Sequence, residues 1–305
     1  MNILVIGLGS IALKHIQAIR TVFKDVEISA LRSNNTNTGD VAGVKNIFSF
    51  EDIVDKPDFI LISNPTNKHY DTIEKCIEIG CPLMIEKPVL QNTEGYEKLL
   101  DKINQKNILT YVACNLRFHP VLIFLRKYVQ ARKRAINEVN IYCGSYLPDW
   151  RPNRNFREIY SANAEMGGGV HLDLIHEIDY CLWIFGNPIK SDSIKRNKSS
   201  LAITAVDYAH YDLEYSTFFA TVTLNYYRKD AKRRIEILFE DGTWLIDLIK
   251  GEITDEKGER IFKEDFNMLN TYTNQLLYFV DCINKNTQPM NNFEEAIKTL
   301  RVCTE

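Results

Sequence analysis

Near its start the chain reads Asn2-Ile3-Leu4-Val5-Ile6-Gly7-Leu8-Gly9-Ser10-Ile11-Ala12, an apolar run followed directly by a glycine-containing turn. An apolar run without alternation is typical of a strand buried on both faces of a parallel sheet. A helical period follows from Leu13 to Phe23, so the order is strand, Gly-x-Gly-x-x-Ala, helix. This order predicts a dinucleotide-binding α/β domain. The alternative is a glycine turn in an unrelated α/β domain.

The residue types in this turn suit a pyrophosphate. Gly7 permits the tight turn, Gly9 lacks a Cβ where the phosphates would approach, and the small Ala12 lets the helix pack closely. The first amide groups of the helix would face the phosphates, because a helix N-terminus carries unpaired N–H donors and partial positive charge. We therefore expect cofactor contacts from Gly7, Gly9, Ser10, Ile11 and Ala12.

The end of the second predicted strand, Val26 to Leu31, bears on the choice of cofactor. An NAD enzyme usually has a carboxylate there, which binds the 2'-hydroxyl of the adenosine ribose. Arg32 and Ser33 follow instead, and they suit the 2'-phosphate of NADP. The sequence therefore favours NADP slightly over NAD, with an ordinary solvated arginine as the alternative. Asn34 to Asp40 has no apolar period and is predicted to be a loop.

Three further apolar runs continue the parallel sheet: Asp58 to Ile62, Pro82 to Ile85 and Thr110 to Cys114. Ligands of a doubly wound sheet bind outside the carboxyl ends of its strands. The first of these runs leads into Asn64-Pro65-Thr66, so we expect these three residues to touch the cofactor, although a plain strand-to-helix turn would also account for them. His69 begins the next helix and is interpreted as a packing or capping residue without a chemical role.

The second of these runs leads into Glu86-Lys87-Pro88. A lysine at the carboxyl end of a strand, next to a nicotinamide, can hold a substrate oxygen and stabilise the charge that develops there during hydride transfer. Pro88 would restrain the backbone beside it. The alternative for this tripeptide is an ordinary surface turn.

A second stretch with candidate chemistry is Gly167-Gly168-Gly169-Val170-His171-Leu172-Asp173-Leu174-Ile175-His176-Glu177-Ile178-Asp179. Three glycines allow the backbone to approach a ligand closely, and the apolar period after them predicts a helix that starts there. In that helix Asp173, His176 and Tyr180 would share one face. A carboxylate three residues from an imidazole can fix its tautomer and favour proton acceptance. A surface aspartate and a packed histidine are the alternative.

Composition argues against several other classes of protein. A length of 305 residues suggests two domains, and 45% hydrophobic residues supply more than one core. The net charge of -3 comes with no long basic block, so we expect no nucleic-acid partner. The seven cysteines show no metal-ligand spacing, so we predict no metal site and reduced thiols in the cytoplasm. We expect neither secretion nor membrane insertion, because signal-peptide regions and long apolar runs are missing.

After residue 120, strands follow one another with few helices between them. Strands are predicted at Glu138 to Cys143, Ile203 to Ala205, Leu213 to Tyr215, Phe218 to Tyr227, Arg234 to Phe239 and Thr243 to Leu248. This arrangement predicts an α+β domain with a large, mostly antiparallel open sheet packed on helices. Helices are predicted at Val121 to Val129, at Tyr272 to Asn284 and from Phe293, which Asn292 would cap.

A long segment without periodicity lies between the first of these strands and the glycines. Loops of this length in compact domains are often functional. Aromatic rings stack on sugars, and arginines bind carboxylates or phosphates. We therefore expect substrate contacts from Tyr146, Trp150, Arg154 and Tyr160, with structural packing as the alternative for each.

In their order along the chain, these motifs resemble the glucose-fructose oxidoreductase / inositol dehydrogenase / rhizopine catabolism (Gfo/Idh/MocA) family of nicotinamide-dependent sugar oxidoreductases. The resemblance covers nearly the whole chain. It implies that Lys87, Asp173 and His176 form the catalytic group and contact the substrate. We also count His69, Glu86 and Lys87 among the cofactor contacts. Ser145 to Pro152 resembles, more weakly, a subgroup associated with bacterial surface-sugar and nonulosonic acid pathways.

The predicted organisation is an α/β Rossmann domain with a doubly wound parallel sheet over residues 1–117, followed by an α+β substrate-binding and oligomerisation domain over 118–305. The family resemblance implies that the free face of the second sheet forms a homodimer or homotetramer. It also leads us to expect a last helix shorter than in other members.

We predict an enzyme that transfers a hydride between NADP or NAD and a carbon of a sugar, sugar acid or nucleotide-sugar. Lys87 would polarise the reacting oxygen, His176 would exchange its proton, and Asp173 would orient the histidine. Two alternatives stay open. One is a cofactor-binding sensor or regulatory protein without turnover, and the other is a reductase of a non-sugar carbonyl such as a tetrapyrrole or diol.

Overall fold

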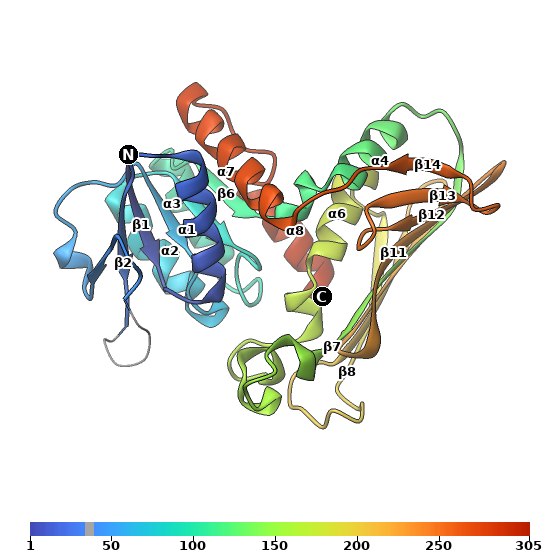
Figure 1. Cartoon of the computed structure of the whole chain (residues 1–305), viewed down its shortest axis with the longest axis horizontal. Coiled ribbons are helices and arrows are strands. Elements are labelled where there is room, and N and C mark those ends of the chain that lie inside the picture. The colour runs from blue at the N-terminus through green and yellow to red at the C-terminus, as the bar shows by residue number, and fades with distance from the viewer. Residues whose placement is uncertain (34–39) are drawn as a thin grey trace. The chain divides into compact units, whose positions relative to one another are not determined.

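The computed structural model describes residues 1–33 and 40–305. They form two compact units. The first comprises Met1–Asn115 and Met268–Leu300, and the second comprises Leu116–Asn267 and Arg301–Glu305 (Figure 1). The loop predicted over 34–40 lies, apart from Asp40, outside the described residues.

The first unit is built on a six-stranded parallel sheet with the order β3-β2-β1-β4-β5-β6. β1 lies between β2 and β4, so the sheet extends from it in both directions. Every residue of β4, β5 and β6 is buried, which accounts for their uninterrupted apolar runs. The predicted doubly wound fold is confirmed. The strands are β1 Asn2–Ile6, β2 Glu27–Leu31, β3 Val44–Ile47, β4 Phe59–Ile62, β5 Leu83–Glu86 and β6 Thr110–Ala113.

A helix from late in the chain completes the core of this unit. Phe279 of α7 lies with its ring centroid 5.5 Å from that of Phe59 in β4 and 5.7 Å from that of Tyr111 in β6. The predicted domain over 118–305 differs from the compact units here, because the apolar face of α7 packs on the first sheet. The helices of the unit are α1 Ser10–Val22, α2 His69–Ile79, α3 Tyr96–Gln105, α7 Met268–Lys285 and most of α8 Phe293–Thr304.

The residues just before α8 cover part of the edge of the first sheet. The Asn291 carbonyl accepts from the Val112 N–H at 2.8 Å, and the Asn291 side-chain amide donates to the Val112 carbonyl at 2.9 Å. These bonds satisfy backbone groups of β6, the last strand of the sheet, which an open edge would leave unpaired. Asn292 then caps α8 as predicted, because its side chain accepts from the Glu295 N–H at 2.9 Å.

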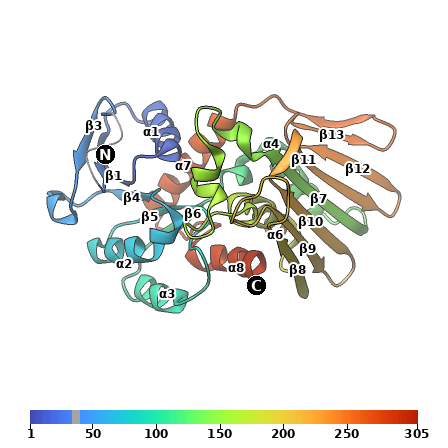
Figure 2. The same ribbon diagram turned by 90° about the horizontal axis from the view of Figure 1, so that it is seen from below.

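The second unit is built on an eight-stranded sheet with the order β14-β13-β12-β11-β7-β10-β9-β8 (Figure 2). Neighbouring strands are antiparallel, except that β7 and β10 run parallel. The predicted large, mostly antiparallel sheet is confirmed. The strands are β7 Ile136–Tyr146, β8 Lys190–Arg196, β9 Tyr208–Glu214, β10 Phe219–Asn225, β11 Tyr227–Phe239, β12 Gly242–Asp247, β13 Glu252–Asp255 and β14 Arg260–Lys263.

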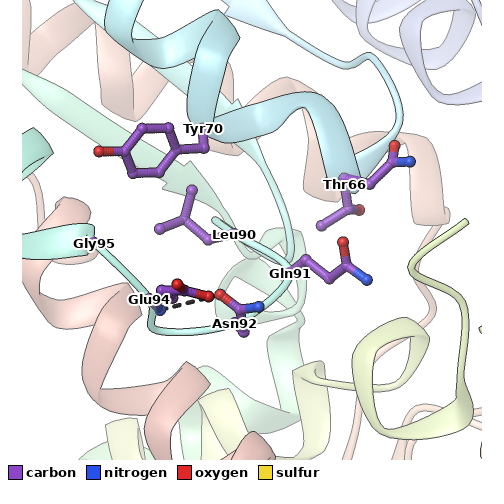
Figure 3. A pocket seen from close by; sticks show the side chains of 8 residues that line it. Thr66, Tyr70, Leu90, Gln91, Asn92, Glu94 and Gly95 are labelled. Atoms are coloured by element: carbon purple, nitrogen blue, oxygen red, sulfur yellow. Dashed lines mark hydrogen bonds between the residues drawn. The ribbon is translucent and has the colours of Figure 1, made fainter. Parts of the chain in front are cut away.

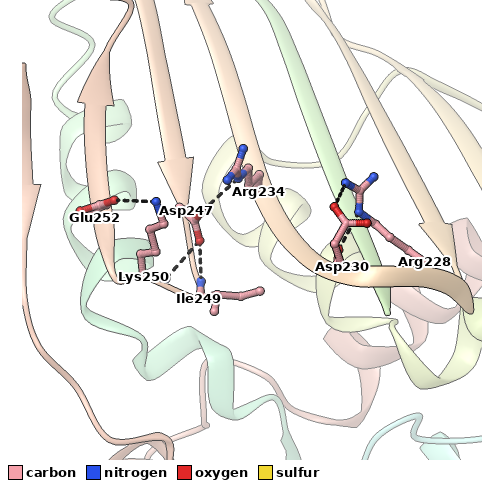
Figure 4. Close-up of polar contacts among 7 residues, drawn as sticks. All are labelled: Arg228, Asp230, Arg234, Asp247, Ile249, Lys250 and Glu252. Carbon is pink, nitrogen blue, oxygen red and sulfur yellow. Dashed lines mark hydrogen bonds and ion pairs between the residues drawn. The ribbon is translucent and has the colours of Figure 1, made fainter. Parts of the chain in front are cut away.

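The two faces of this sheet have different surroundings. Helices α4 Pro120–Gln130 and α6 His176–Phe185 pack on one face (Figure 1), where alternate strand residues such as Ile141 are buried in the core. The opposite face, called the outer face below, carries polar pairs. One of them joins Arg234 of β11 to Asp247 of β12, with Nε donating to Oδ2 at 3.0 Å (Figure 4).

One predicted strand is wrong and one observed strand was not predicted, each for an identifiable reason. Ile203 to Ala205 is not a strand but a buried bend, in which the Ala205 N–H donates to the Ala162 carbonyl at 3.2 Å. Its apolar side chains pack in a loop. Conversely, β8 was not predicted, because its sequence Lys-Ser-Asp-Ser-Ile-Lys-Arg has no apolar alternation. It forms the edge of the sheet, where polar side chains are tolerated.

No helix among the described residues combines the length and the apolarity needed to cross a membrane. Within residues 1–33 and 40–305, no group of three His, Cys, Asp or Glu side chains could hold a metal ion. All seven cysteines are buried, and each is a free thiol.

Candidate active site

The turn after β1 is packed against the protein at one glycine and open at the other. Gly7 has φ 85°, and a Cβ added there would lie 2.8 Å from Cα of Asn64. No described atom beyond its chain neighbours lies within 4 Å of a Cβ added at Gly9. Gly9 directly precedes α1, whose first N–H groups cannot bond within the helix. Exposed Ser10, partly exposed Ile11 and buried Ala12 follow it. This geometry fits the pyrophosphate of a dinucleotide.

His69 connects two strand ends. One ring nitrogen lies 3.0 Å from the carbonyl oxygen of Asn64, after β4, and the other lies 3.1 Å from that of Val89, after β5. Burial lowers the pKa of this imidazole. The Asn64 side chain is also fixed, since its amide donates to the Thr72 hydroxyl at 2.8 Å. His69 and Asn64 therefore hold the backbone at the carboxyl ends of β4 and β5.

A cavity of about 370 Å³ lies beside these strand ends (Figure 3). Thr66, after β4, and Gln91, after β5, line one side of it. Of the residues predicted to bind the cofactor, its described lining includes only Thr66; the neighbouring Pro65 is exposed. This cavity is therefore not the predicted cofactor site as a whole.

Glu86 is paired inside the protein. It is 6% exposed, and its Oε1 lies 2.5 Å from Nε2 of His15 in α1, while its Oε2 accepts from the Lys87 backbone N–H at 3.2 Å. The His15 ring also contacts Tyr272 of α7 edge-on, with centroids 5.2 Å apart. His15 thus holds the Glu86 carboxylate, and Glu86 in turn accepts a hydrogen bond that fixes the backbone of Lys87 at the end of β5. Sequence reasoning did not find His15, because its partner is 71 residues away.

Arg32 directly follows β2 and is buried. Its side chain is 4% exposed, and its Nη1 lies 4.0 Å from the Asp40 carboxylate. Ser33 beside it is exposed. These contacts do not test the binding of a 2'-phosphate, so recognition of NADP by Arg32 stays a prediction.

In the second unit, Gly168 is packed against the loop that precedes it in the sequence. A Cβ at Gly168 would collide with the Tyr160 carbonyl oxygen and lie 2.9 Å from that of Asn163. Gly169 has φ 141°, a value that favours glycine. We predicted that these glycines allow a ligand to approach, and at Gly168 this is wrong because the preceding loop occupies that space.

The helix predicted after the glycines is broken into two. Val170–Asp173 forms the single turn α5, and α6 starts at His176, after two residues outside either helix. The predicted common face is also incomplete: Tyr180 is fully buried, whereas Asp173 and His176 are partly exposed. Asp173 and His176 therefore belong to different helical segments.

Asp173 is held by a tyrosine that sequence reasoning did not find. The Tyr226 hydroxyl donates to its Oδ2 at 2.5 Å. Burial, and then the negative charge of Asp173, raise the pKa of Tyr226 well above 10, so the phenol stays protonated and donates. The Trp150 ring packs edge-on against Tyr226, with centroids 5.3 Å apart. These contacts fix one oxygen of the carboxylate and place Trp150 one side chain away from it.

Two buried ion pairs anchor α6. Fully buried Glu177 accepts from Nε of Arg233 in β11 at 2.6 Å and from its Nη2 at 3.3 Å. Asp179, 1% exposed, accepts from Nε and Nη2 of Arg117 at 2.9 and 2.7 Å. Such two-pronged pairs are strong and directional. They fix the rotation of the helix that begins at His176.

The long segment places the predicted substrate residues in different surroundings. Trp150 is 38% exposed and donates from Nε1 to Ser145 at 2.9 Å. The Tyr160 hydroxyl donates to the Gly167 carbonyl at 2.7 Å. Tyr146 ends β7, under the ammonium of Lys229 at 5.6 Å. Arg154 is exposed. Trp150 lies next to the group around Asp173, and Tyr160 holds the glycine turn.

Comparison with known proteins gives one family match in the N-terminal part of the chain and another in the part that contains the second sheet. Residues 1–114 match the oxidoreductase family with an NAD-binding Rossmann fold, and residues 130–245 match the GFO/IDH/MocA C-terminal domain. Levoglucosan dehydrogenase from Pseudarthrobacter phenanthrenivorans is 28% identical over 138 residues, which cover 44% of this chain and 35% of that protein. The scyllo-inositol 2-dehydrogenase (NADP(+)) IolW from Bacillus subtilis is 25% identical over 204 residues, which cover 64% and 54%. The chain thus spans about a third to a half of the length of these relatives.

A solved structure shows the same fold over the whole chain. The WlbA dehydrogenase from Bordetella pertussis, in complex with NADH and UDP-GlcNAcA, matches with a TM-score of 0.81 at 16% identity, covering 99% of this chain and 94% of that one. The two family matches together cover the whole of the first sheet and strands β7 to β11 of the second. The chain therefore belongs to the Gfo/Idh/MocA family of oxidoreductases.

Proposed function

We propose that the protein is a nicotinamide-dependent oxidoreductase that transfers a hydride to or from a carbon of a sugar-like substrate. The observation that carries this proposal is the open space at Gly9, directly before α1, which suits a cofactor pyrophosphate. Family membership supports it, because the first family match is described as an NAD-binding Rossmann fold. The relatives named above are dehydrogenases of levoglucosan and of scyllo-inositol.

Three residues carry the proposed chemistry. When bound, the nicotinamide supplies the acceptor or donor of the hydride. In alcohol oxidation the Lys87 ammonium holds the hydroxyl oxygen and stabilises negative charge on it. His176 takes the hydroxyl proton as the hydride leaves the carbon, and Asp173 orients the imidazole for that transfer. In carbonyl reduction His176 returns the proton to the oxygen.

The proposed substrate is a sugar, sugar acid or nucleotide-sugar, in a role in bacterial surface-sugar biosynthesis. Trp150 supports this class, because its partly exposed ring lies next to Tyr226, the hydrogen-bond partner of Asp173. Arg154 is exposed on the same segment and suits a carboxylate or phosphate. NADP is proposed over NAD on account of Arg32, and the cytoplasm is the proposed location.

A turnover assay tests the proposed function directly. The protein is incubated with NADP or NAD and a panel of inositols, free sugars, sugar acids and nucleotide-sugars, and absorbance reports the reduced nicotinamide. We expect turnover of at least one member. Lys87→Met should lower it roughly a hundredfold or more, as loss of one transition-state donor commonly does, in a folded protein that still binds the cofactor. Lys98→Met, on the exposed side of α3, is the matched control. Cofactor binding without turnover of any sugar would support the sensor, and turnover of only a non-sugar carbonyl would support the other alternative.

We also propose that the outer face of the eight-stranded sheet forms a homodimer or homotetramer. Its strands β8, β10 and β12 carry exposed apolar side chains at Ile194, Phe219 and Leu245. Light scattering should give a mass of two or four chains. Phe219→Asp should lower that mass, whereas Val54→Asp, on the first unit, should not. An unmutated protein that scatters as one chain at micromolar concentration would contradict the proposal.

A further inference from the structure

We propose that Tyr226 is a positioning residue, whose hydroxyl holds the Asp173 carboxylate in the orientation that proton exchange at His176 requires. This inference rests on the proposed function and adds a residue to it. The Tyr226 hydroxyl donates to Oδ2 of Asp173 at 2.5 Å, across 53 residues of sequence. Tyr226 acts through Asp173 and takes no part in the proton exchange itself.

Asp173 lies where the helix alone does not fix a side chain. It is the last residue of α5, a single turn from Val170 to Asp173, and Leu174 and Ile175 follow outside either helix. A single helical turn has little stability of its own in water. A partly exposed carboxylate at such a position has several rotamers open to it. A partner from elsewhere in the fold is therefore needed to set its direction.

Tyr226 is a rigid partner. It lies between β10 and β11 and is fully buried. Its backbone N–H donates to the Asp207 carbonyl at 3.1 Å, and its carbonyl accepts from the Leu147 N–H at 2.8 Å. Both hydrogen-bonding groups of its backbone are thus engaged by other segments of the chain. The phenol is fixed before any ligand binds, as a positioning group must be.

Trp150 packs on the phenol from the long segment. The two rings meet edge-on, with an interplanar angle of 89° and centroids 5.3 Å apart. The indole is held in turn, because its Nε1 donates to the Ser145 hydroxyl at 2.9 Å. These contacts bury the hydrogen bond between Tyr226 and Asp173 on the tyrosine side. A hydrogen bond to a charged group is stronger in such surroundings than in water.

The chemistry of the phenol suits positioning rather than proton transfer. Burial, and then the charge of Asp173, raise the pKa of Tyr226 well above 10, so the hydroxyl keeps its proton and donates throughout the working pH range. With Oδ2 held, the plane of the carboxylate is set, and the direction of Oδ1 follows from it. Loss of the hydroxyl should therefore slow the chemical step and leave the binding of substrate and cofactor largely unchanged.

Turnover of the full chain, with a substrate from the panel above, tests this expectation. Tyr226→Phe keeps the buried ring and removes only the hydroxyl. We expect kcat to fall about tenfold or more, as loss of a hydrogen bond to a charged group does. The KM of the sugar should change less than about twofold, because the interaction acts on the chemical step. The matched control is Tyr215→Phe, which removes a buried hydroxyl that donates to the Gly186 carbonyl at 3.1 Å, just after the far end of α6. It should lower the melting temperature by a similar amount with kcat unchanged.

A double variant separates positioning from packing. If Tyr226 acts through Asp173, Tyr226→Phe should cause no further loss of kcat in Asp173→Ala, because the carboxylate that it orients is gone. Alanine is used because asparagine could still accept from the hydroxyl. Losses of kcat that multiply would overturn the inference. So would a Tyr226→Phe variant that melts at a lower temperature but has the kcat of the unmutated protein.

Nitrogen magnetic resonance of labelled histidine gives a readout that needs no turnover. The ring signals of His176, assigned with His176→Ala, report the tautomer of the imidazole. We expect Tyr226→Phe and Asp173→Ala to shift these signals in the same direction, and Tyr215→Phe to leave them in place. Unchanged signals in Tyr226→Phe would overturn the inference. The expected shifts without turnover of any sugar would instead reject the proposed function and leave the positioning by Tyr226 standing.

Discussion

The two units place their functional residues by different means. In the first unit mainly the backbone does so: one turn sets Gly7 and Gly9, and a strand end sets Lys87, with the long-range pair of His15 and Glu86 behind it. In the second unit side chains far apart in the sequence do so. Glu177 pairs with Arg233, 56 residues away, and Asp173 with Tyr226, 53 residues away.

This difference predicts how each unit responds to substitution. A change at an open turn alters what the turn can bind and leaves the core intact. A change at a buried charge leaves its partner charged without compensation in a medium of low polarity, which costs stability first. Substitutions at the open part of the turn in the first unit should therefore lower affinity, and those at the buried charges of the second unit should lower stability, activity or both.

The largest effect is expected where a buried pair of the second unit is broken. Glu177→Gln keeps the side-chain shape but leaves Arg233 without its carboxylate, and we expect the free energy of unfolding to fall by about 3 to 5 kcal/mol. Urea denaturation measures it. Glu295→Gln, in the exposed pair with Lys298, is the control and should cost less than about 1 kcal/mol. Equal losses in the two variants would remove the contrast between the units.

Asp173 and His176 come next, because they test whether the second unit also acts in catalysis. If His176 exchanges the proton and Asp173 orients it, His176→Ala and Asp173→Asn should each lower turnover roughly a hundredfold, and the double variant should lose much less than the product of the two. The pH profile of kcat/KM should lose one limb in His176→Ala. Reduced melting temperatures with unchanged turnover per folded molecule would instead assign both residues to packing.

His119 makes the stability of the second unit depend on pH. Its Nδ1 accepts from the Val121 N–H at 3.2 Å at the start of α4, and its Nε2 faces the Leu248 carbonyl at 3.1 Å. Burial lowers the pKa of this buried imidazole to about 4. The folded state thus favours the neutral ring, and its contribution is complete above the unfolded pKa, about 6.5, and lost as pH falls toward 4.

We expect the neutral His119 ring to contribute about 2 kcal/mol less at pH 5 than at pH 7. Denaturation at the two pH values measures the change. His119→Asn retains a side-chain cap but does not titrate, so its stability should vary less with pH. A variant with the same pH dependence as the unmutated protein would assign the effect to other groups.

A pair of glycine substitutions separates the two functions of the first turn. Gly9→Ala has open space and should weaken cofactor binding about tenfold while the melting temperature stays the same. Gly7→Ala must adopt φ 85° against Asn64 and should lower the free energy of unfolding by about 1 to 2 kcal/mol. Unchanged cofactor affinity in Gly9→Ala would count against the pyrophosphate site.

The smallest effect concerns the choice of cofactor. We expect NADPH to bind about tenfold more tightly than NADH, and the gap to shrink in Arg32→Ala, since a charge-assisted pair contributes roughly 1.5 to 3 kcal/mol. Fluorescence titration of both cofactors measures it. Lys24→Ala, at an exposed residue just after α1, serves as the control. Equal affinities in the unmutated protein would contradict recognition of the 2'-phosphate by Arg32.

The same contrast explains which features the sequence could predict. β1 and the turn at Gly7 and Gly9 were predictable because adjacent residues define both the structure and its chemistry. The long-range partners were not. His15 and Glu86 are 71 residues apart, Arg117 and Asp179 are 62 residues apart, and no local period connects them.

Gly168 shows how a local pattern can mislead. A glycine needed for a ligand and one needed for a neighbouring loop look identical in a sequence, and here the loop at Tyr160 is the neighbour. The break between α5 and α6 was also hidden, since Leu174 is a good helix former, Ile175 is an intermediate one, and neither residue type signals a helix end. Strand β8 was missed for the opposite reason, because an edge strand needs no apolar alternation.

The return of the chain at Met268 has a consequence for synthesis on the ribosome. Translation delivers β1 to β6 first, yet α7, which covers Phe59 and Tyr111, is made only after the whole of the second sheet. Domains generally fold as units from the N-terminus while the chain emerges. We therefore expect the nascent first unit to wait with part of its apolar sheet exposed. The backbone groups at the edge of β6 should stay unpaired until Asn291 leaves the ribosome. During that period the exposed strand edge could pair with other chains, so binding of a chaperone to the nascent chain should matter most then.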